Sequence, residues 1–257
     1  MPNGTARCHI RRPRRRGRAF LGGFNIHREN SRRHYGEHRW RDTHVAFTGP
    51  LARQAHEAFR AMWLERAWSP GPEAEPPSAV VLPNKSADCQ HRLRCIFAAM
   101  FGSARERIDL TTPYFVPDEV TQKALVAAAD RGVEVRLLVP QKGDTPPVRW
   151  IARRVYAPLI HRGVRVFGYR PRLLHAKTVS VDGDWVTIGT ANLDYRSLFL
   201  NHELNLCARD PALAQGLEAQ FEADLTEAKE LDPAADAPDA VTERLLAPLA
   251  WGARRWL

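Results

Sequence analysis

The feature that most constrains this chain is a strand–turn–strand pattern in its second half. Residues 178–181 favour extended structure, residues 182–184 (Asp-Gly-Asp) predict a tight turn, and residues 185–188 resume the extended pattern. His175 and Lys177 lie two residues apart, so an extended chain directs both side chains to the same face. We therefore expect a rigid hairpin that presents an imidazole and an ammonium group together.

These residue types suit the handling of a phosphate. An imidazole can attack phosphorus or exchange a proton near neutral pH, and an ammonium group and the amide of Asn192 can hold the charge on phosphate oxygens. Gly189 ends the second strand and, with Thr190 after it, can bring the backbone close to a ligand. A lone His-x-Lys pair is more often solvated surface, so the prediction of a phosphate site depends on the whole arrangement.

The intervals resemble those of the HKD motif of the phospholipase D superfamily, here His175-x-Lys177-x4-Asp182-x6-Gly189-Thr190-x-Asn192. The continuation to Glu203 resembles the second HKD region of bacterial cardiolipin synthases. In that superfamily two HKD motifs meet across a pseudo-twofold interface, without a metal or another cofactor. The resemblance implies that one histidine forms a phosphohistidine, while the other protonates the leaving alcohol and then activates the incoming one.

The resemblance also implies roles for single residues. His175 would be a catalytic imidazole, and Lys177 and Asn192 would bind non-bridging phosphate oxygens. Glu203 would accept a hydrogen bond from the other nitrogen of His175 and fix its tautomer. Asp182 has two interpretations, a direct catalytic role or a structural hydrogen bond within the turn.

The first half of the resemblance is incomplete. A short apolar segment ending in two glycines precedes Asn25 and echoes residues 189–193, and residues 40–44 (Trp-Arg-Asp-Thr-His) resemble the segment that follows the first HKD region. Asn25 and His44 would then be the counterparts of Asn192 and Glu203. A convincing His-x-Lys pair is missing before this segment.

Three interpretations of the missing motif follow. The chain is a truncated or frame-disrupted product with weak or no activity; it forms a homodimer that pairs two copies of His175, as single-motif family nucleases do; or His9 serves as the second imidazole. Tyr114 lies in a segment that resembles residues near the family's pocket, although alone it would fit a loop anchor.

Alternating strand and helix patterns predict an α/β sandwich, a mixed sheet flanked by helices, as the resemblance also implies. We expect strands at 40–47 and 202–208, a loop at 27–39, and helices at about 118–130 and 147–162. The chain divides into an Arg-rich tail expected to be disordered (1–18), a remnant of the first phospholipase D-like half (19–68), a Pro-rich linker (69–78), a second phospholipase D-like domain (79–230) and a C-terminal tail or helix (231–257).

Composition bounds the partners. The net charge is +9, and seven of the first 18 residues are arginines, which favours an anionic membrane surface, an anionic phospholipid substrate or, as the weaker candidate, nucleic acid. No run approaches the roughly 20 apolar residues of a membrane-spanning helix, and we see no secretory signal. The four cysteines lack paired spacing, so we expect reduced thiols and a cytoplasmic protein peripheral to the inner membrane.

The function that these observations favour is phosphatidyl transfer to a glycerol-type alcohol, as in cardiolipin synthesis. The alternatives are a phosphodiesterase or nuclease on the same scaffold, acting as a dimer, and a catalytically impaired remnant. Phosphatidyl transfer and phosphodiester hydrolysis both depend on His175. A protein that is strictly monomeric in solution would favour the impaired remnant over the dimer.

Overall fold

The structure is a computed structural model that describes residues 9–10, 17–66, 78–85, 91–141 and 154–232. The predictions for most of the Arg-rich tail, most of the linker, the first residues of the helix at 147–162 and the C-terminal tail lie outside the described residues. The division of the chain at residues 69–78 therefore stays a prediction.

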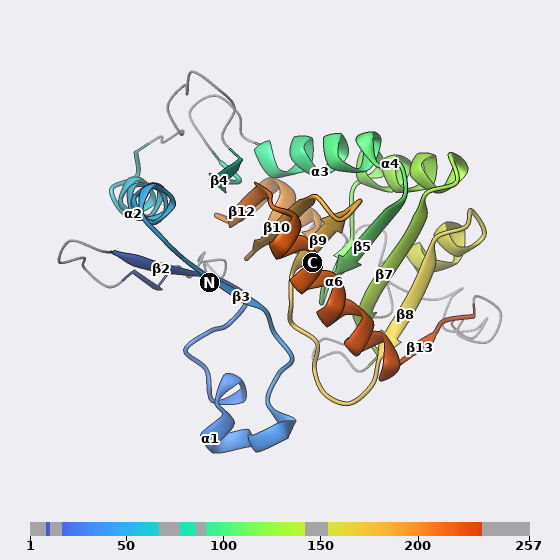
Figure 1. Cartoon of the computed structure of the whole chain (residues 1–257), viewed down its shortest axis with the longest axis horizontal. Helices are drawn as coiled ribbons and strands as arrows, with labels where there is room; N and C mark the ends of the chain where they lie inside the picture. The colour runs from blue at the N-terminus through green and yellow to red at the C-terminus, as the bar shows by residue number, and fades with distance from the viewer. Residues whose placement is uncertain (1–8, 11–16, 67–77, 86–90, 142–153, 233–257) are drawn as a thin grey trace, which may run out of the picture.

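A mixed eight-stranded sheet forms the larger part of the molecule (Figure 1). Its central strands β5, β7 and β8 pair in parallel, and every other neighbouring pair is antiparallel. In order across the sheet the strands are β13 (Ala228–Glu230), β8 (Arg165–Tyr169), β7 (Glu134–Pro140), β5 (Arg107–Thr111), β9 (Thr178–Val181), β10 (Trp185–Gly189), β12 (Leu204–Arg209) and β4 (Ala79–Pro83).

Helices cover both faces of this sheet, which confirms the predicted α/β sandwich. On one face lie α3 (Arg92–Ser103) and α4 (Glu119–Asp130), and on the other lies α6 (Pro211–Thr226) (Figure 1). Residues 154–160 are also helical. Asp118, at the start of the helix expected at about 118–130, caps α4, because its side chain accepts a hydrogen bond from the Val120 amide.

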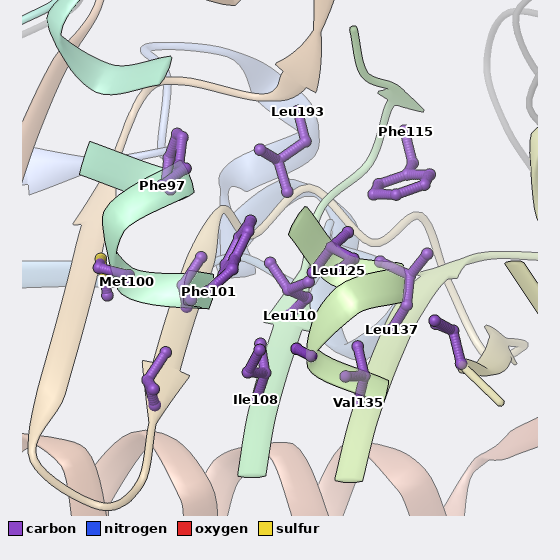
Figure 2. Close-up of a cluster of buried hydrophobic side chains, with 14 of the residues drawn as sticks. Phe97, Met100, Phe101, Ile108, Leu110, Phe115, Leu125, Val135, Leu137 and Leu193 are labelled. Atoms are coloured by element: carbon purple, nitrogen blue, oxygen red, sulfur yellow. The ribbon is translucent and has the colours of Figure 1, made fainter. Parts of the chain in front are cut away.

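The main core lies between the sheet and the α3–α4 layer (Figure 2). Alternation along the strands places Ile108 and Leu110 of β5 and Leu137 of β7 towards Phe97 of α3 and Leu125 of α4. On the opposite face a smaller cluster packs beneath α6, and it includes Leu138, Phe167, Tyr169, Leu174 and Phe221.

A second, smaller sheet contains β1 (His9–Ile10), β2 (Arg18–Gly22) and β3 (His44–Thr48), followed by α2 (Pro50–Trp63). Ala19 and Leu21 of β2 share one buried cluster with Leu204 and Leu206 of β12. The two sheets therefore pack against each other through the strands that lead to the candidate site.

Three local predictions differ from the structure. The segment expected to be a loop at 27–39 contains η1 (Arg28–Asn30), α1 (Arg32–Tyr35) and η2 (Gly36–His38). The strand expected at 40–47 begins at His44, because Arg41 instead forms an isolated parallel bridge with Leu174 in the other half. Residues 115–116, expected in a loop, form β6 (Phe115–Val116), which pairs with β11 (Leu193–Asp194).

Candidate active site

His175 lies between β8 and β9, in an extended segment that the first half of the chain holds in place. The amide of His175 donates to the carbonyl of Arg41 at 2.7 Å, and the amide of Arg41 donates to the carbonyl of Leu173 at 2.8 Å. The two halves thus meet at the backbone of the imidazole that the sequence singled out.

The carboxylate that orients His175 belongs to Asp42. Nδ1 of His175 lies 2.8 Å from Oδ2 of Asp42, whose side chain is fully buried. Because a carboxylate only accepts, Nδ1 carries the proton, and the lone pair of Nε2 faces the other way. Trp40 packs on the same imidazole, with ring centroids 5.1 Å apart. Nε2 then lies on the side of the ring that faces Lys177.

Asp42 is held rigidly in turn. Its Oδ1 accepts from the amide of Thr43 at 2.8 Å. Gly23 passes so close that a Cβ there would lie 2.2 Å from Oδ1 of Asp42, which only glycine avoids. The orientation of His175 therefore depends on backbone geometry as well as on one hydrogen bond to Asp42.

A buried ion pair anchors the same segment to the larger domain. Arg41 donates from Nε and Nη2 to the two carboxylate oxygens of Asp224 on α6, at 2.9 and 2.6 Å. Its Nη1 donates to the Asp42 carbonyl and to Oγ1 of Thr43. Residues 40–43 are fixed on the larger domain by charge and by backbone bonds together.

Lys177 lies where the sequence predicted, beside His175. Its Nζ is 3.2 Å from Nε2 of His175 and donates to the His175 carbonyl at 2.5 Å. The lysine is buried, at 6% exposed, so its ammonium charge acts in a medium of low dielectric. A phosphate oxygen brought to Nε2 would meet this charge directly.

A local pseudo-twofold relationship is visible in the two pairs of strands that lead to the site. In β10 and β12 the amide of Thr190 donates to the carbonyl of Leu204 at 3.0 Å, and the amide of Ala191 donates to Oδ1 of Asn205 at 3.2 Å. Gly189 permits this approach, because a Cβ there would lie 2.1 Å from the same Oδ1.

The first half repeats these contacts with different residues. In β2 and β3 the amide of Gly23 donates to the carbonyl of Thr43 at 3.2 Å, and the amide of Phe24 donates to Nδ1 of His44 at 3.1 Å. Gly22 pairs with His44 as Gly189 pairs with Asn205. The counterpart of His44 is therefore Asn205, which corrects the predicted match with Glu203.

By the same register the counterpart of Glu203 is Asp42. The expectation that Glu203 accepts a hydrogen bond from His175 is accordingly wrong about the carboxylate, because Asp42 from the other half bonds Nδ1. Glu203 accepts from Oγ1 of Thr190 at 2.5 Å, Oγ of Ser197 at 3.1 Å and Nδ2 of Asn201 at 3.2 Å. Burial raises the pKa of Glu203 to about 7, so this carboxyl is partly protonated near neutral pH.

Asn192 lies between β10 and β11. Its Oδ1 is buried without a hydrogen-bond partner among the described residues, and its side chain bonds the carboxyl of Asp194. Asp194 also accepts from the Ser197 amide at 2.7 Å. Burial raises the pKa of Asp194, although these bonds and the charge of Lys177 oppose the rise.

Asp182 lies at the far end of the hairpin, about 20 Å along the chain from His175 at the rise of an extended strand. It adopts a left-handed conformation, with φ 52°, and accepts from the amides of Arg105, Glu106 and Arg107 at 2.8–2.9 Å. Burial raises the pKa of this carboxyl, but the three backbone bonds prevail and hold the pKa below its ordinary value. These contacts are those of a structural turn residue.

Two other predicted residues have different surroundings. The Asn25 carbonyl accepts from Nδ2 of Asn30, at the start of the segment that contains α1. Tyr114 packs against the main core between β5 and β6. In β1, His9 pairs with Phe20, as Val179 pairs with Thr187 in the equivalent strands β9 and β10. The local pseudo-twofold therefore matches His9 with Val179 and not with His175.

A polar cavity of about 230 Å³ is lined by residues that include Trp40, Arg41, Asp42 and Asp224. Within the described ranges, no three His, Cys, Asp or Glu side chains come together as a metal site would need. No helix of the described residues is long and apolar enough to cross a bilayer.

The sequence reasoning missed Asp42, Arg41 and Asp224. Asp42 stands two residues before His44 as Glu203 stands two before Asn205, and both are acidic. This shared offset could have identified Asp42. The prediction instead matched His44 with Glu203, which shifted the alignment of the two halves by two residues. Asp224 is an unremarkable acidic residue in a helix, and only the fold brings it to Arg41.

Comparison with known proteins adds sequence relatives. A family model described as "Cardiolipin synthase, PLD-like domain" matches residues 97–225. The chain is 39% identical over 226 residues to cardiolipin synthase A of Pseudomonas aeruginosa, and 34% identical over 224 residues to the probable cardiolipin synthase YwiE of Bacillus subtilis. Each match covers 83% of this chain but 45% of the relative, so the chain spans less than half the length of these curated relatives.

Two solved structures share the fold. Phosphatidylserine synthase of Haemophilus influenzae matches 94% of this chain and 68% of its own, with a TM-score of 0.69 and 15% identity. Nuc, a phospholipase D family member of Salmonella typhimurium, matches 61% of this chain and 99% of its own, with a TM-score of 0.52 and 22% identity.

Proposed function

Because the chain belongs to the family of cardiolipin synthases with a phospholipase D-like domain, we propose that it takes part in phosphatidyl transfer from a phospholipid to a glycerol-type alcohol. The observation that carries this proposal is the His175 site. Asp42 holds the proton on Nδ1, and Nζ of Lys177 stands 3.2 Å from Nε2. A nucleophilic nitrogen and a buried cation meet at one point, as attack on a phosphodiester requires.

The proposed reaction has two displacements at phosphorus. In the first, the lone pair of Nε2 forms a bond to phosphorus while the bond to the leaving glycerol oxygen breaks, and that oxygen takes up a proton. In the second, an acceptor hydroxyl loses its proton and attacks phosphorus, and the bond to Nε2 breaks. Lys177 and Asn192 are proposed to hold the non-bridging oxygens, and Gly189 and Thr190 to shape the backbone beside them.

The proton donor for the leaving oxygen is a second imidazole in the reaction that the resemblance implies. Among the described residues none occupies the place related to His175 by the local pseudo-twofold. The step that we assign to this chain is therefore the one at His175, and the donor is a group outside the described residues or on another chain.

A homodimer that pairs two copies of His175 is a separate proposal, and it requires part of this chain to move. A second copy related by the same axis would place its Glu203 where Asp42 now bonds His175. Residues 40–43, held by the Arg41–Asp224 ion pair, would have to leave. Sedimentation of the protein at several concentrations tests this arrangement.

The decisive experiment is formation of a covalent adduct on His175. The protein is mixed with phosphatidylglycerol vesicles and quenched in alkali, where phosphohistidine survives, and intact mass is measured. We expect a mass increase of one phosphatidyl group, with cardiolipin among the extracted lipids if a donor group is present. His175→Ala should abolish the adduct, and His161→Ala, which removes an exposed histidine, should keep it.

An adduct that persists in His175→Ala would refute the proposal. The alternative, hydrolysis of nucleic acid, is favoured only by the net charge of +9. Cleavage of single-stranded DNA that depends on His175, in a preparation without lipid adduct, would favour that alternative. A folded protein that does neither would be the impaired remnant.

A further inference from the structure

The segment between β2 and β3 is ordered, yet none of the residues in η1, α1 and η2 is buried. Ile26, at the start of this segment, is 81% exposed, and Tyr35 in α1 is 41% exposed. Apolar side chains in such positions gain nothing from the core of the protein. An ordered segment that exposes an isoleucine almost completely is suited to an apolar surface outside the molecule.

Basic side chains surround these two apolar residues. Residues 26–39, hereafter the basic loop, contain four arginines against two glutamates. Arg28, Arg32 and Arg33 are exposed. Arg172 adds a further positive charge from the neighbouring segment, where its Nη1 donates to the carbonyl of Glu37 at 3.1 Å. The loop therefore combines a positive charge with apolar side chains that face solvent.

The root of the basic loop touches the candidate active site. The ring of His27 stacks on Trp40, with centroids 5.9 Å apart, and Trp40 packs in turn on His175. The amide of Trp40 donates to the Glu29 carbonyl at 2.9 Å, which closes the loop at its base. A surface that meets this loop is thus brought next to the reactive imidazole.

We propose that the basic loop docks the protein on an anionic lipid bilayer. Ile26 and Tyr35 enter the interface between headgroups and acyl chains, and the exposed arginines contact headgroup phosphates. The inference rests on the proposed function only for the choice of a lipid as ligand, since the loop and its charge are properties of the structure.

A second exposed apolar site provides a matched control. At the end of α2, Trp63 is 74% and Leu64 46% exposed, and the same helix carries the exposed Arg53 and Arg60. α2 follows the last residue of β3, whereas the basic loop precedes its first residue, so α2 and α1 lie beyond opposite ends of that strand (Figure 1). Docking through α2 would turn the basic loop and His175 away from the membrane.

The test is flotation of the full chain with vesicles of phosphatidylcholine, with or without phosphatidylglycerol. Arg28→Glu/Arg33→Glu is compared with Arg53→Glu/Arg60→Glu, which makes the same charge change on α2. Since each basic residue near an anionic surface contributes several-fold to binding, we expect the loop variant to bind phosphatidylglycerol vesicles at least about tenfold more weakly and the α2 variant to stay within about threefold of wild type. The Arg-rich tail is common to both variants.

A second pair of variants changes no charge. Ile26→Ser should weaken binding about three- to tenfold, and Trp63→Ser should leave it unchanged. All of these side chains are exposed, so the thermal melts of the variants should match that of the wild type. Equal binding by the wild type and the loop variants, or equal losses in the loop and α2 variants, would overturn the proposal.

Nucleic acid is a further outcome of the same test. If the loop variants lose binding to single-stranded DNA but keep binding to phosphatidylglycerol vesicles, the basic loop is not a lipid-docking surface. The experiment needs no turnover. Vesicle binding without a His175 adduct would uphold the docking surface while removing the proposed function, and the reverse result would do the opposite.

Discussion

The two halves of the molecule share one local geometry but differ in what supports it. β10 and β12 lie inside an eight-stranded sheet that is covered by helices on both faces. β2 and β3 belong to a three-stranded sheet whose buried side chains pack against the larger half. Even so, the smaller half supplies Asp42, the carboxylate on which the orientation of His175 depends.

Each half of the molecule depends on the other for a different property. The smaller half needs β12 and α6 of the larger half to bury Leu21 and to neutralise Arg41. The larger half has a complete core of its own, but its imidazole is held by a residue from the smaller half. Stability and chemistry can therefore be separated by substituting equivalent residues on the two sides.

The largest expected effect comes from Asp42. Asp42→Asn keeps the shape but replaces an acceptor-only group, so the Nδ1–H tautomer of His175 loses its preference. Adduct formation should fall about a thousandfold, equivalent to about 4 kcal/mol. The tautomer can be followed without turnover by ¹⁵N NMR of the imidazole. The control is Asp184→Asn, at a partly exposed turn aspartate, which should change neither quantity. An unchanged His175 spectrum in Asp42→Asn would show that Asp42 does not fix the tautomer.

The next effect is on stability. Arg41→Ala leaves the buried Asp224 carboxylate without its partner, which should cost about 3 kcal/mol of unfolding free energy in a urea titration. The double variant Arg41→Met/Asp224→Leu should recover most of this loss, because no buried charge remains. If the double variant is as unstable as the single one, packing and not charge holds the halves together.

Glu203 predicts a pH dependence in the larger half. Its pKa is raised to about 7 in the folded protein from 4.5, so the folded state binds the proton more tightly than the unfolded state. The stabilisation is fully present below pH 4.5 and is lost as the pH rises through 7, to a limit of about 3 kcal/mol. Glu203→Gln should flatten the unfolding free energy over this window, whereas the matched Asp42→Asn should leave the slope in place.

The smallest effect belongs to Asp182. Asp182→Ala removes the acceptor for three amides and places alanine at a positive φ, which should lower the unfolding free energy by about 2 kcal/mol. Adduct formation per folded molecule should stay within about twofold of wild type. A large loss of adduct in a stable Asp182→Ala protein would instead favour the direct catalytic role.

The sequence was sufficient to predict the elements with strong local signals. The strands at 178–181 and 185–188, the turn between them and the helix at about 118–130 were predicted, because strand propensity, turn residues and an N-cap act within a few residues. The pairing of His175 with Lys177 was also local. α1 was missed because residues 27–39 contain no apolar periodicity, and a segment without buried side chains leaves none.

The carboxylate on His175 could not be assigned by local reasoning. Glu203 was expected from the resemblance of its segment to the second HKD region, yet Asp42 reaches His175 across the interface between the halves. Arg41 and Asp224 form a pair only after α6 has packed on the sheet. These contacts are decided by tertiary structure, and a single sequence carries no periodic signal for them.

The Arg41–Asp224 contact also fixes when the site can be completed. The two residues are separated by 183 positions, and at a synthesis rate of about 5–20 residues per second Arg41 leaves the ribosome roughly 10 to 40 s before its partner. During that interval β2 and β3 have no β12 to pack against, while the parallel strands of the larger half are still being made. The contact between His175 and Asp42 is therefore among the last parts of the described structure to be held in place.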